Sequence, residues 1–224
     1  MRRWISLAGG GFGALVVLSG CLLAPQVGQL ERMKNNRVKG DLESNSRESL
    51  MCSASAAECY QLHLIKGDAC SALAAQATAV ASRRNLDTCA AGNLLEGVTM
   101  ASAEQTPVGD LHGYGLERLE ALRDLIDTRG AGDPSGADAL AEAAQQFVGR
   151  YAGDPAGPFY LASARLTVAE DRFLADADAA ALCTSLSDID GLARTGDAAP
   201  GNLQSQYHNL ARSIADLRRT GGCT

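Results

Sequence analysis

Apolar residues at helical spacing, divided by short Gly-, Pro- and Asp-containing breaks, constrain this fold more than any other feature. The clearest stripe joins Leu116, Leu119, Leu122, Leu125 and Ile126, and the charged residues of this segment lie largely off it. No segment alternates apolar and polar residues with a period of two over a useful length. We therefore expect an all-α fold of about eight helices.

Short breaks place these helices in antiparallel pairs. Gly67 fits a left-handed helix end and Asp68 an N-cap, so a turn is expected at this point. Stacked hairpins follow, either as an α-solenoid or as a compact bundle. The expected helices cover about 50–65, 69–83, 86–101, 116–126, 137–151, 158–173, 178–194 and 202–219.

The first residues carry an export signal. A basic start at Arg2 and Arg3 precedes a short apolar stretch, which ends in Leu18-Ser19-Gly20-Cys21. These four residues resemble the lipobox of bacterial lipoproteins. The resemblance implies cleavage after residue 20 and acylation of Cys21, which anchors the chain in a membrane. The alternatives are an ordinary secreted protein and an uncleaved anchor.

The resemblance also bears on which membrane is used. Leu22, not Asp, follows the lipidated position, which in Gram-negative lipoproteins favours the outer membrane, facing the periplasm, over the inner membrane. Residues 22–49 are polar and rich in Gly, Asn and Ser, so we interpret 21–49 as a lipidated flexible tether. Residues 50–224 then form the helical domain.

The net charge of the chain limits the kinds of molecule that it is expected to bind. The net charge of the chain is −6, and removal of Arg2 and Arg3 with the signal makes it more acidic. Nucleic acid requires a basic face, so it is not an expected partner. An acidic chain also lacks an electrostatic attraction to anionic lipid. Membrane binding is thus expected through the lipid on Cys21 alone.

Six further cysteines support the prediction of export. An even number of cysteines is typical of a chain that forms disulfide bonds, and disulfide bonds form mainly outside the cytoplasm. There is no CxxC pair and the three histidines are far apart in sequence, so a metal site is not expected. Burial of some cysteines as small apolar residues is the alternative. The six residues are Cys52, Cys59, Cys70, Cys89, Cys183 and Cys223.

Residues 143–166 resemble a tetratricopeptide repeat, in which an aromatic residue ends one helix, an Asp-Pro turn follows, and aromatic and small residues recur in the next. No strict 34-residue period can be laid over the whole chain. The resemblance implies stacked helical hairpins with an extended concave surface for protein partners. The residues that carry it are Phe147, Tyr151, Asp154, Pro155, Tyr160, Ala162 and Ala164.

Hairpin geometry then suggests one set of disulfides. A turn at Lys66-Gly67 would let Cys59 and Cys70 face each other, with Cys52 and Cys89 at the far end of the same hairpin. Cys183 and Cys223 would lie at one end of the last hairpin.

Catalytic motifs are not found. No P-loop, nucleophile elbow or dinucleotide fingerprint occurs, and His63, His112 and His208 have no evident partners in the sequence. Gly113 and Gly115 permit close backbone approach, so His112 and Tyr114 are candidate ligand-binding residues, with a plain helix start as the alternative.

An acidic run after residue 170 has no EF-hand spacing and is interpreted as a solvated helix face. We expect no cofactor and no enzymatic activity, although an enzyme with an unrecognised site remains a third alternative. The leading hypothesis is a membrane-anchored scaffold that binds a cell-envelope protein. The second is a small-ligand accessory similar to the third component of tripartite periplasmic transporters.

Overall fold

A computed structural model describes residues 25–52, 58–103, 111–129 and 135–223. These residues form α-helices and one 3-10 turn, with no strand among them, which confirms the all-α prediction. The helices are α1 (Pro25–Lys39), α2 (Leu42–Arg47), α3 (Cys59–Ala74), α4 (Val80–Ala103), α5 (Leu111–Asp127), α6 (Ser135–Arg150), α7 (Ala156–Asp176), α8 (Ala179–Ala193) and α9 (Gly201–Gly221), and the turn is η1 (Arg194–Ala198).

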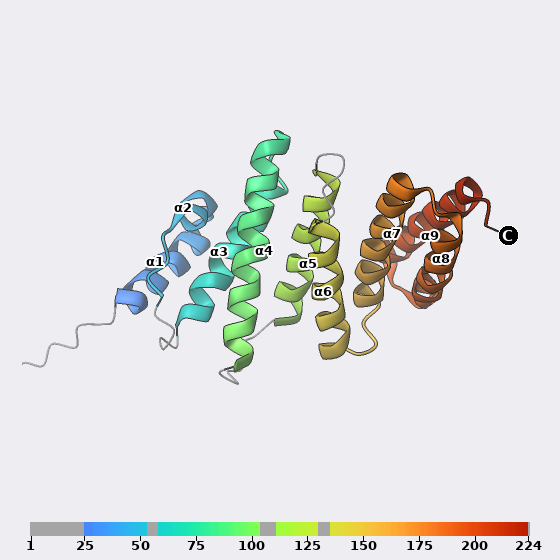
Figure 1. Ribbon diagram of the computed structural model, residues 1–224. Coiled ribbons are helices and arrows are strands. Elements are labelled where there is room, and N and C mark those ends of the chain that lie inside the picture. Colours follow the sequence, from blue (N-terminus) through green and yellow to red (C-terminus); the bar gives the residue numbers. More distant parts are fainter. Residues whose placement is uncertain (1–24, 53–57, 104–110, 130–134, 224) are drawn as a thin grey trace, which may run out of the picture.

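The helices stand side by side in chain order, from α1 at one end of the row to α8 and α9 at the other (Figure 1). Each helix from α3 to α9 packs on the next. In addition, α5 contacts α3 and α7, and α7 contacts α9, so the odd-numbered helices form a layer of their own. Within the described ranges, no helix is long and apolar enough to cross a bilayer.

Small residues make up much of the core. One apolar cluster runs from α3 to α9 and contains many alanines beside larger anchors such as Leu94, Phe159 and Leu186. A second, smaller cluster lies at the N-terminal end and joins Leu30 and Met33 of α1 to Leu62 and Ile65 of α3. The core therefore extends along the row instead of filling one centre.

Helix boundaries in the C-terminal half follow the sequence signals. Asp178 caps α8, because its side chain accepts a hydrogen bond from the Ala181 amide. Gly222 ends α9 in the left-handed conformation, with φ of 68°. Polar caps and glycine stops need only local geometry, so here the sequence prediction is close to the structure.

The predicted turn at Lys66-Gly67 is wrong. Helix α3 continues through both residues to Ala74, and α4 begins at Val80. Gly67 is a packing residue: a Cβ added there would lie 2.7 Å from Cγ of Leu94 in α4. Gly97 of α4 has the same relation to Leu64 of α3, at 2.7 Å from its Cγ. A glycine that admits a neighbouring helix resembles a C-cap glycine in sequence.

The prediction of a flexible tether over residues 21–49 is wrong for its described part. Residues 25–39 and 42–47 form α1 and α2, and α1 buries Leu30 and Met33 against α3. Asp41 caps α2 by accepting a hydrogen bond from the Ser44 amide. The sequence did not reveal the apolar surface on which α1 packs, because that surface belongs to α3, more than twenty residues later in the chain. Cys21 lies outside the described residues.

Two disulfides tie helices together. Cys183 and Cys223 are bonded as predicted, with Cα atoms 5.4 Å apart. Cys70 is bonded to Cys89, so the predicted Cys59–Cys70 and Cys52–Cys89 pairings are wrong. The reason is the misplaced turn: Cys70 lies inside α3 and faces α4, not Cys59 in its own helix.

Candidate functional site

A groove crosses the layer of odd-numbered helices between α5, α7 and α9. Its volume is about 180 Å³. We call it the inner groove. Its lining residues are Arg123, Ile126, Asp127, Leu140, Phe159, Ser163, Leu166, Thr167, Gln206, Asn209, Leu210 and Ser213.

The inner groove has an apolar floor and a polar rim. Phe159 and Leu140 at the floor are at most 1% exposed, and Ile126, Leu166 and Leu210 are also buried. The rim carries hydroxyl and amide side chains from α7 and α9. Because each amide both donates and accepts, such a rim can pair with peptide groups, while the floor takes an apolar side chain.

Arg123 of α5 lines the inner groove and contacts both α7 and α9. Its Nη1 donates to Oε1 of Gln206 in α9 at 3.5 Å, and its guanidinium lies 4.9 Å from the centre of the Phe159 ring in α7. Asp127, one turn further along α5, is 3.9 Å from Arg123 Nε. One side chain therefore spans three helices, which shows that α5 and α9 approach each other across α7.

An acidic row on α5, formed by Glu120 and Asp124, lies beside the groove residue Arg123. Glu120 and Asp124 are exposed, yet partial desolvation beside neighbouring helices raises the pKa of both carboxyls, and Asp124 also raises that of Glu120. Burial raises the pKa of the Tyr160 hydroxyl of α7, with a further contribution from the charge on Glu120. Negative charge is thus concentrated on this face of α5, with Arg83 and Arg123 as the cations beside it.

Asp87 of α4 is a buried carboxylate in the same region. It is 2% exposed, and its Oδ2 has no hydrogen-bond partner. Burial, with a smaller contribution from the charge on Asp124, raises its pKa to about 6, and the charge on Arg83 opposes this shift. Asp87 therefore belongs to the α4–α5 interface and shares the acidic potential of the row.

His112 does not reach the inner groove. Its Nε2 lies 2.5 Å from Oδ2 of Asp154, and its ring packs against Phe147 and Tyr151 at 5.3 and 4.8 Å between centres. Oδ1 of Asp154 accepts from the Ala156 amide at the start of α7. His112 thus fastens the start of α5 to the turn between α6 and α7.

Tyr114 has different neighbours from His112. Its hydroxyl accepts a hydrogen bond from Nη1 of Arg37 at 3.4 Å, and Arg37 also pairs with Asp68 at 3.0 Å. Arg37 therefore links α1 to both α3 and α5. The two predicted ligand-binding residues are separated because residues two apart on a helix point in different directions.

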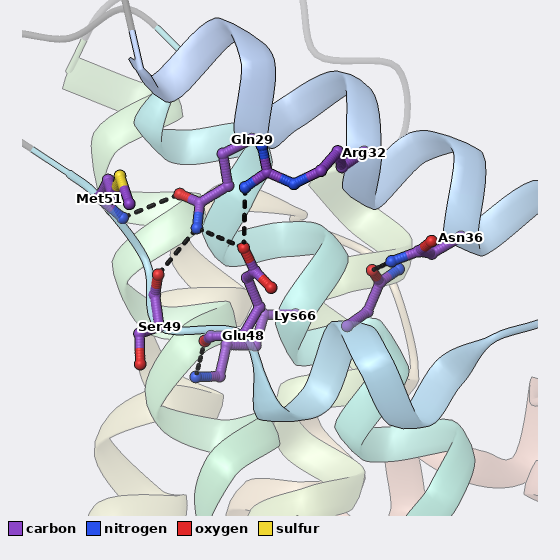
Figure 2. Close-up of polar contacts among 8 residues, drawn as sticks. Gln29, Arg32, Asn36, Glu48, Ser49, Met51 and Lys66 are labelled. Carbon is purple, nitrogen blue, oxygen red and sulfur yellow. Dashed lines mark hydrogen bonds and ion pairs between the residues drawn. The ribbon is translucent and has the colours of Figure 1, made fainter.

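A polar network fastens α1 to residues 48–51, and we call it the N-terminal clamp (Figure 2). Gln29, fully buried, donates to Oε1 of Glu48 and to the Ser49 carbonyl oxygen, both at 2.8 Å, and accepts from the Met51 amide at 2.8 Å. Lys66 of α3 donates to the Glu48 carbonyl oxygen at 2.7 Å. The Gln29 hydrogen bond lowers the pKa of Glu48, with a smaller contribution from Arg32.

The remaining histidines have ordinary surroundings. Nδ1 of His63 lies 3.0 Å from Oδ1 of Asn93, and His208 is exposed on α9. Asp171 pairs with Arg129 at 2.8 Å, and Asp190 with Arg194 at 2.9 Å. Over the described ranges, no group of three acidic, His or Cys side chains is placed to hold a metal ion.

Comparison with family models, curated proteins and solved structures gives no match to this chain. Its geometry therefore carries the functional argument. Sequence reasoning found the helices that carry Arg123 and Gln206 but not their meeting, because the two residues are 83 positions apart. A polar residue beside an apolar stripe looks the same whether it faces solvent or a groove.

Proposed function

We propose that this protein is a membrane-anchored lipoprotein of the bacterial cell envelope that binds an extended segment of another envelope protein in the inner groove. It acts as a non-enzymatic scaffold. The observation that carries the proposal is the inner groove itself, whose buried apolar floor is bordered by amide and hydroxyl side chains from α7 and α9.

The groove's chemistry indicates what kind of segment it accepts. An apolar side chain of the bound segment would pack against the groove floor beside Phe159. The backbone of the same segment would form hydrogen bonds with Gln206 and Asn209 on the rim. The acidic row at Glu120 and Asp124 favours Lys or Arg elsewhere in the segment. A peptide that combines apolar and basic residues therefore fits better than an acidic one.

A small-ligand accessory, similar to the third component of tripartite transporters, is the second candidate. Ligand pockets typically enclose about 300–1,000 Å³. The inner groove measures about 180 Å³, so it has room for a side chain rather than for a whole ligand. For the inner groove, this comparison favours the scaffold.

The proposed anchor would hold the helical array close to the membrane. Residues 21 and 25 are four positions apart, which limits the distance between their Cα atoms to about 14 Å. Since α1 begins at Pro25 and packs on α3, little chain is left for a spacer. We expect the outer membrane to be the site, with the groove facing the periplasm.

Site-specific photo-crosslinking tests the scaffold. A photo-reactive residue at Asn209, on the rim, should crosslink to one envelope protein in native membranes, and the same residue at exposed Glu96 on α4 should not. Arg123→Ala and Gln206→Ala should each reduce recovery of that protein. Equal crosslinking at both positions, or a co-purified small molecule with no protein, would overturn the proposal.

The anchor is tested separately. The Cys21→Ser variant should move from the membrane fraction to the soluble fraction. The control variant, Cys52→Ser, should remain in the membrane fraction. A Cys21→Ser protein that remains membrane-bound would contradict lipid anchoring and leave the groove proposal intact.

A further inference from the structure

Two thiols lie together at the junction between the N-terminal helices and the rest of the molecule. Cys52 and Cys59 take no part in the two disulfides. The Cys52 thiol donates to the carbonyl oxygen of Cys59 at 3.9 Å, and the Cys59 side chain contributes to the raised pKa of the Cys52 thiol. Cys59 is the first residue of α3 and is 2% exposed, and Cys52 packs against the N-terminal apolar cluster.

We propose that Cys52 and Cys59 form a third disulfide in the exported protein, and that this bond fastens residues 48–52 to the first turn of α3. The geometry suits it, because the Cys52 sulfur already lies 3.9 Å from the backbone carbonyl oxygen of Cys59, so a side-chain rotation is the movement that would bring the two sulfur atoms to bonding distance. The bond requires the same oxidising compartment as the other two disulfides. It does not depend on what the inner groove binds.

Bond formation is a thiol–disulfide exchange with an oxidised dithiol protein. One cysteine thiolate attacks a sulfur of that protein's disulfide, which gives a mixed disulfide and releases one carrier thiolate. The second cysteine loses its proton and attacks the first cysteine's sulfur, which releases the other carrier thiolate. Two electrons pass to the carrier, two protons leave the cysteines, and one S–S bond forms.

The chemistry favours a structural bond over a catalytic dithiol. Burial raises the pKa of the Cys52 thiol to about 12, and the hydrogen bond with Cys59 contributes to this shift. A redox catalyst needs a thiolate near neutral pH. In the folded protein the reduced pair therefore reacts slowly, and the oxidised pair is long-lived once formed.

The position of the proposed Cys52–Cys59 bond indicates its structural role. Residues 48–51 are the segment that Gln29 and Lys66 hold in the N-terminal clamp (Figure 2). The segment is followed by Cys52, so the bond would secure the clamp to α3 covalently. Because α1 is the helix nearest the proposed anchor, the link would transmit force from the membrane to the helical array.

Peptide mapping tests the bond directly. The full chain is exported with its own signal, alkylated without reductant, unfolded, and digested with trypsin. Residues 48–66 contain both cysteines and no internal Lys or Arg, so one peptide reports the pair. We expect it to carry no alkyl group and to be lighter by two hydrogen atoms than its reduced form. The linked peptides of Cys70 and Cys89 serve as the internal control.

Other outcomes would overturn the proposal. Two alkyl groups on residues 48–66 would show that the pair stays reduced in the exported protein. A crosslink from this peptide to that of Cys70 or Cys89 would show another pairing. A Cys52→Ser variant adds a second readout, because amide exchange at Ser49 and Met51 should accelerate severalfold. Unchanged exchange would overturn the fastening role.

Discussion

Gly97 of α4 lies directly against Leu64 of α3, and a Cβ added to the glycine would stand 2.6 Å from Cδ2 of the leucine. About one helical turn away on both helices, Gly67 of α3 receives Leu94 of α4 in the same way. The two pairs are reciprocal: each helix supplies one glycine and one leucine. They let α3 and α4 approach closely at this point, within the most extensive helix interface among the described residues.

Substitution of Gly97 by Ala should destabilise the protein by about 1–3 kcal/mol, because the added methyl group overlaps Leu64 and approaches its backbone nitrogen. Gly92 in the same helix is the matched control. A Cβ there meets nothing within 4 Å, so Gly92→Ala should stabilise by about 0.5–1 kcal/mol. Urea unfolding measures both, and a Gly97→Ala variant as stable as Gly92→Ala would refute the packing argument.

Loss of the Gln29 side chain should loosen the N-terminal clamp. Gln29→Ala removes three hydrogen bonds to residues 48–51 and should cost about 2 kcal/mol. Half-buried Gln26, in the same helix, provides the control Gln26→Ala. Hydrogen exchange at the Met51 amide checks the effect locally. If the two variants exchange equally fast there, the clamp does not hold the segment.

Asp87 should make stability depend on pH. Its folded pKa, about 6, lies above the ordinary value because burial disfavours the charge. Below about pH 4 the Asp87 carboxyl is protonated in both the folded and the unfolded protein, so it does not lower the free energy of unfolding. As the pH rises from about 4 through 6, the carboxyl ionises more readily in the unfolded protein, and the free energy of unfolding falls. Asp87→Asn should therefore stabilise by about 1–2 kcal/mol at pH 7.5 and by little at pH 4.

The control for Asp87 is Asp176→Asn, at the exposed end of α7. This variant should show no pH-dependent gain. Thermal unfolding between pH 4 and pH 8 gives the comparison, and a gain from Asp87→Asn that is the same at every pH would exclude titration of this carboxyl as the cause.

The two disulfides should contribute unequally. Chain entropy predicts about 4 kcal/mol for Cys183–Cys223 and about 3 kcal/mol for Cys70–Cys89, because the sequence separations are 40 and 19 residues. Double Ala variants of each pair, unfolded in urea without reductant, measure the two values. Wild-type protein whose midpoint is insensitive to reductant would show that neither bond limits stability.

The sequence was informative where a helix depends on its own residues. The apolar stripe of α5 and the breaks that bound α8 and α9 are local features, and these helices lie close to where they are expected. The Cys183–Cys223 bond followed from one correct hairpin. The inner groove could not be predicted, because Arg123 and Gln206 meet only through the stacking of three helices.

The sequence by itself determined that this chain is helical, acidic and rich in small core residues, since helix periodicity and composition do not depend on distant partners. Only the tertiary structure decided that residues 25–47 are part of the folded array, that Gly67 lies within a helix and that Cys70 meets Cys89. The physical reason is the same in each case. A glycine, a cysteine or a short apolar pair takes its role from the helix packed against it, and that neighbour is set by the fold and not by adjacent residues.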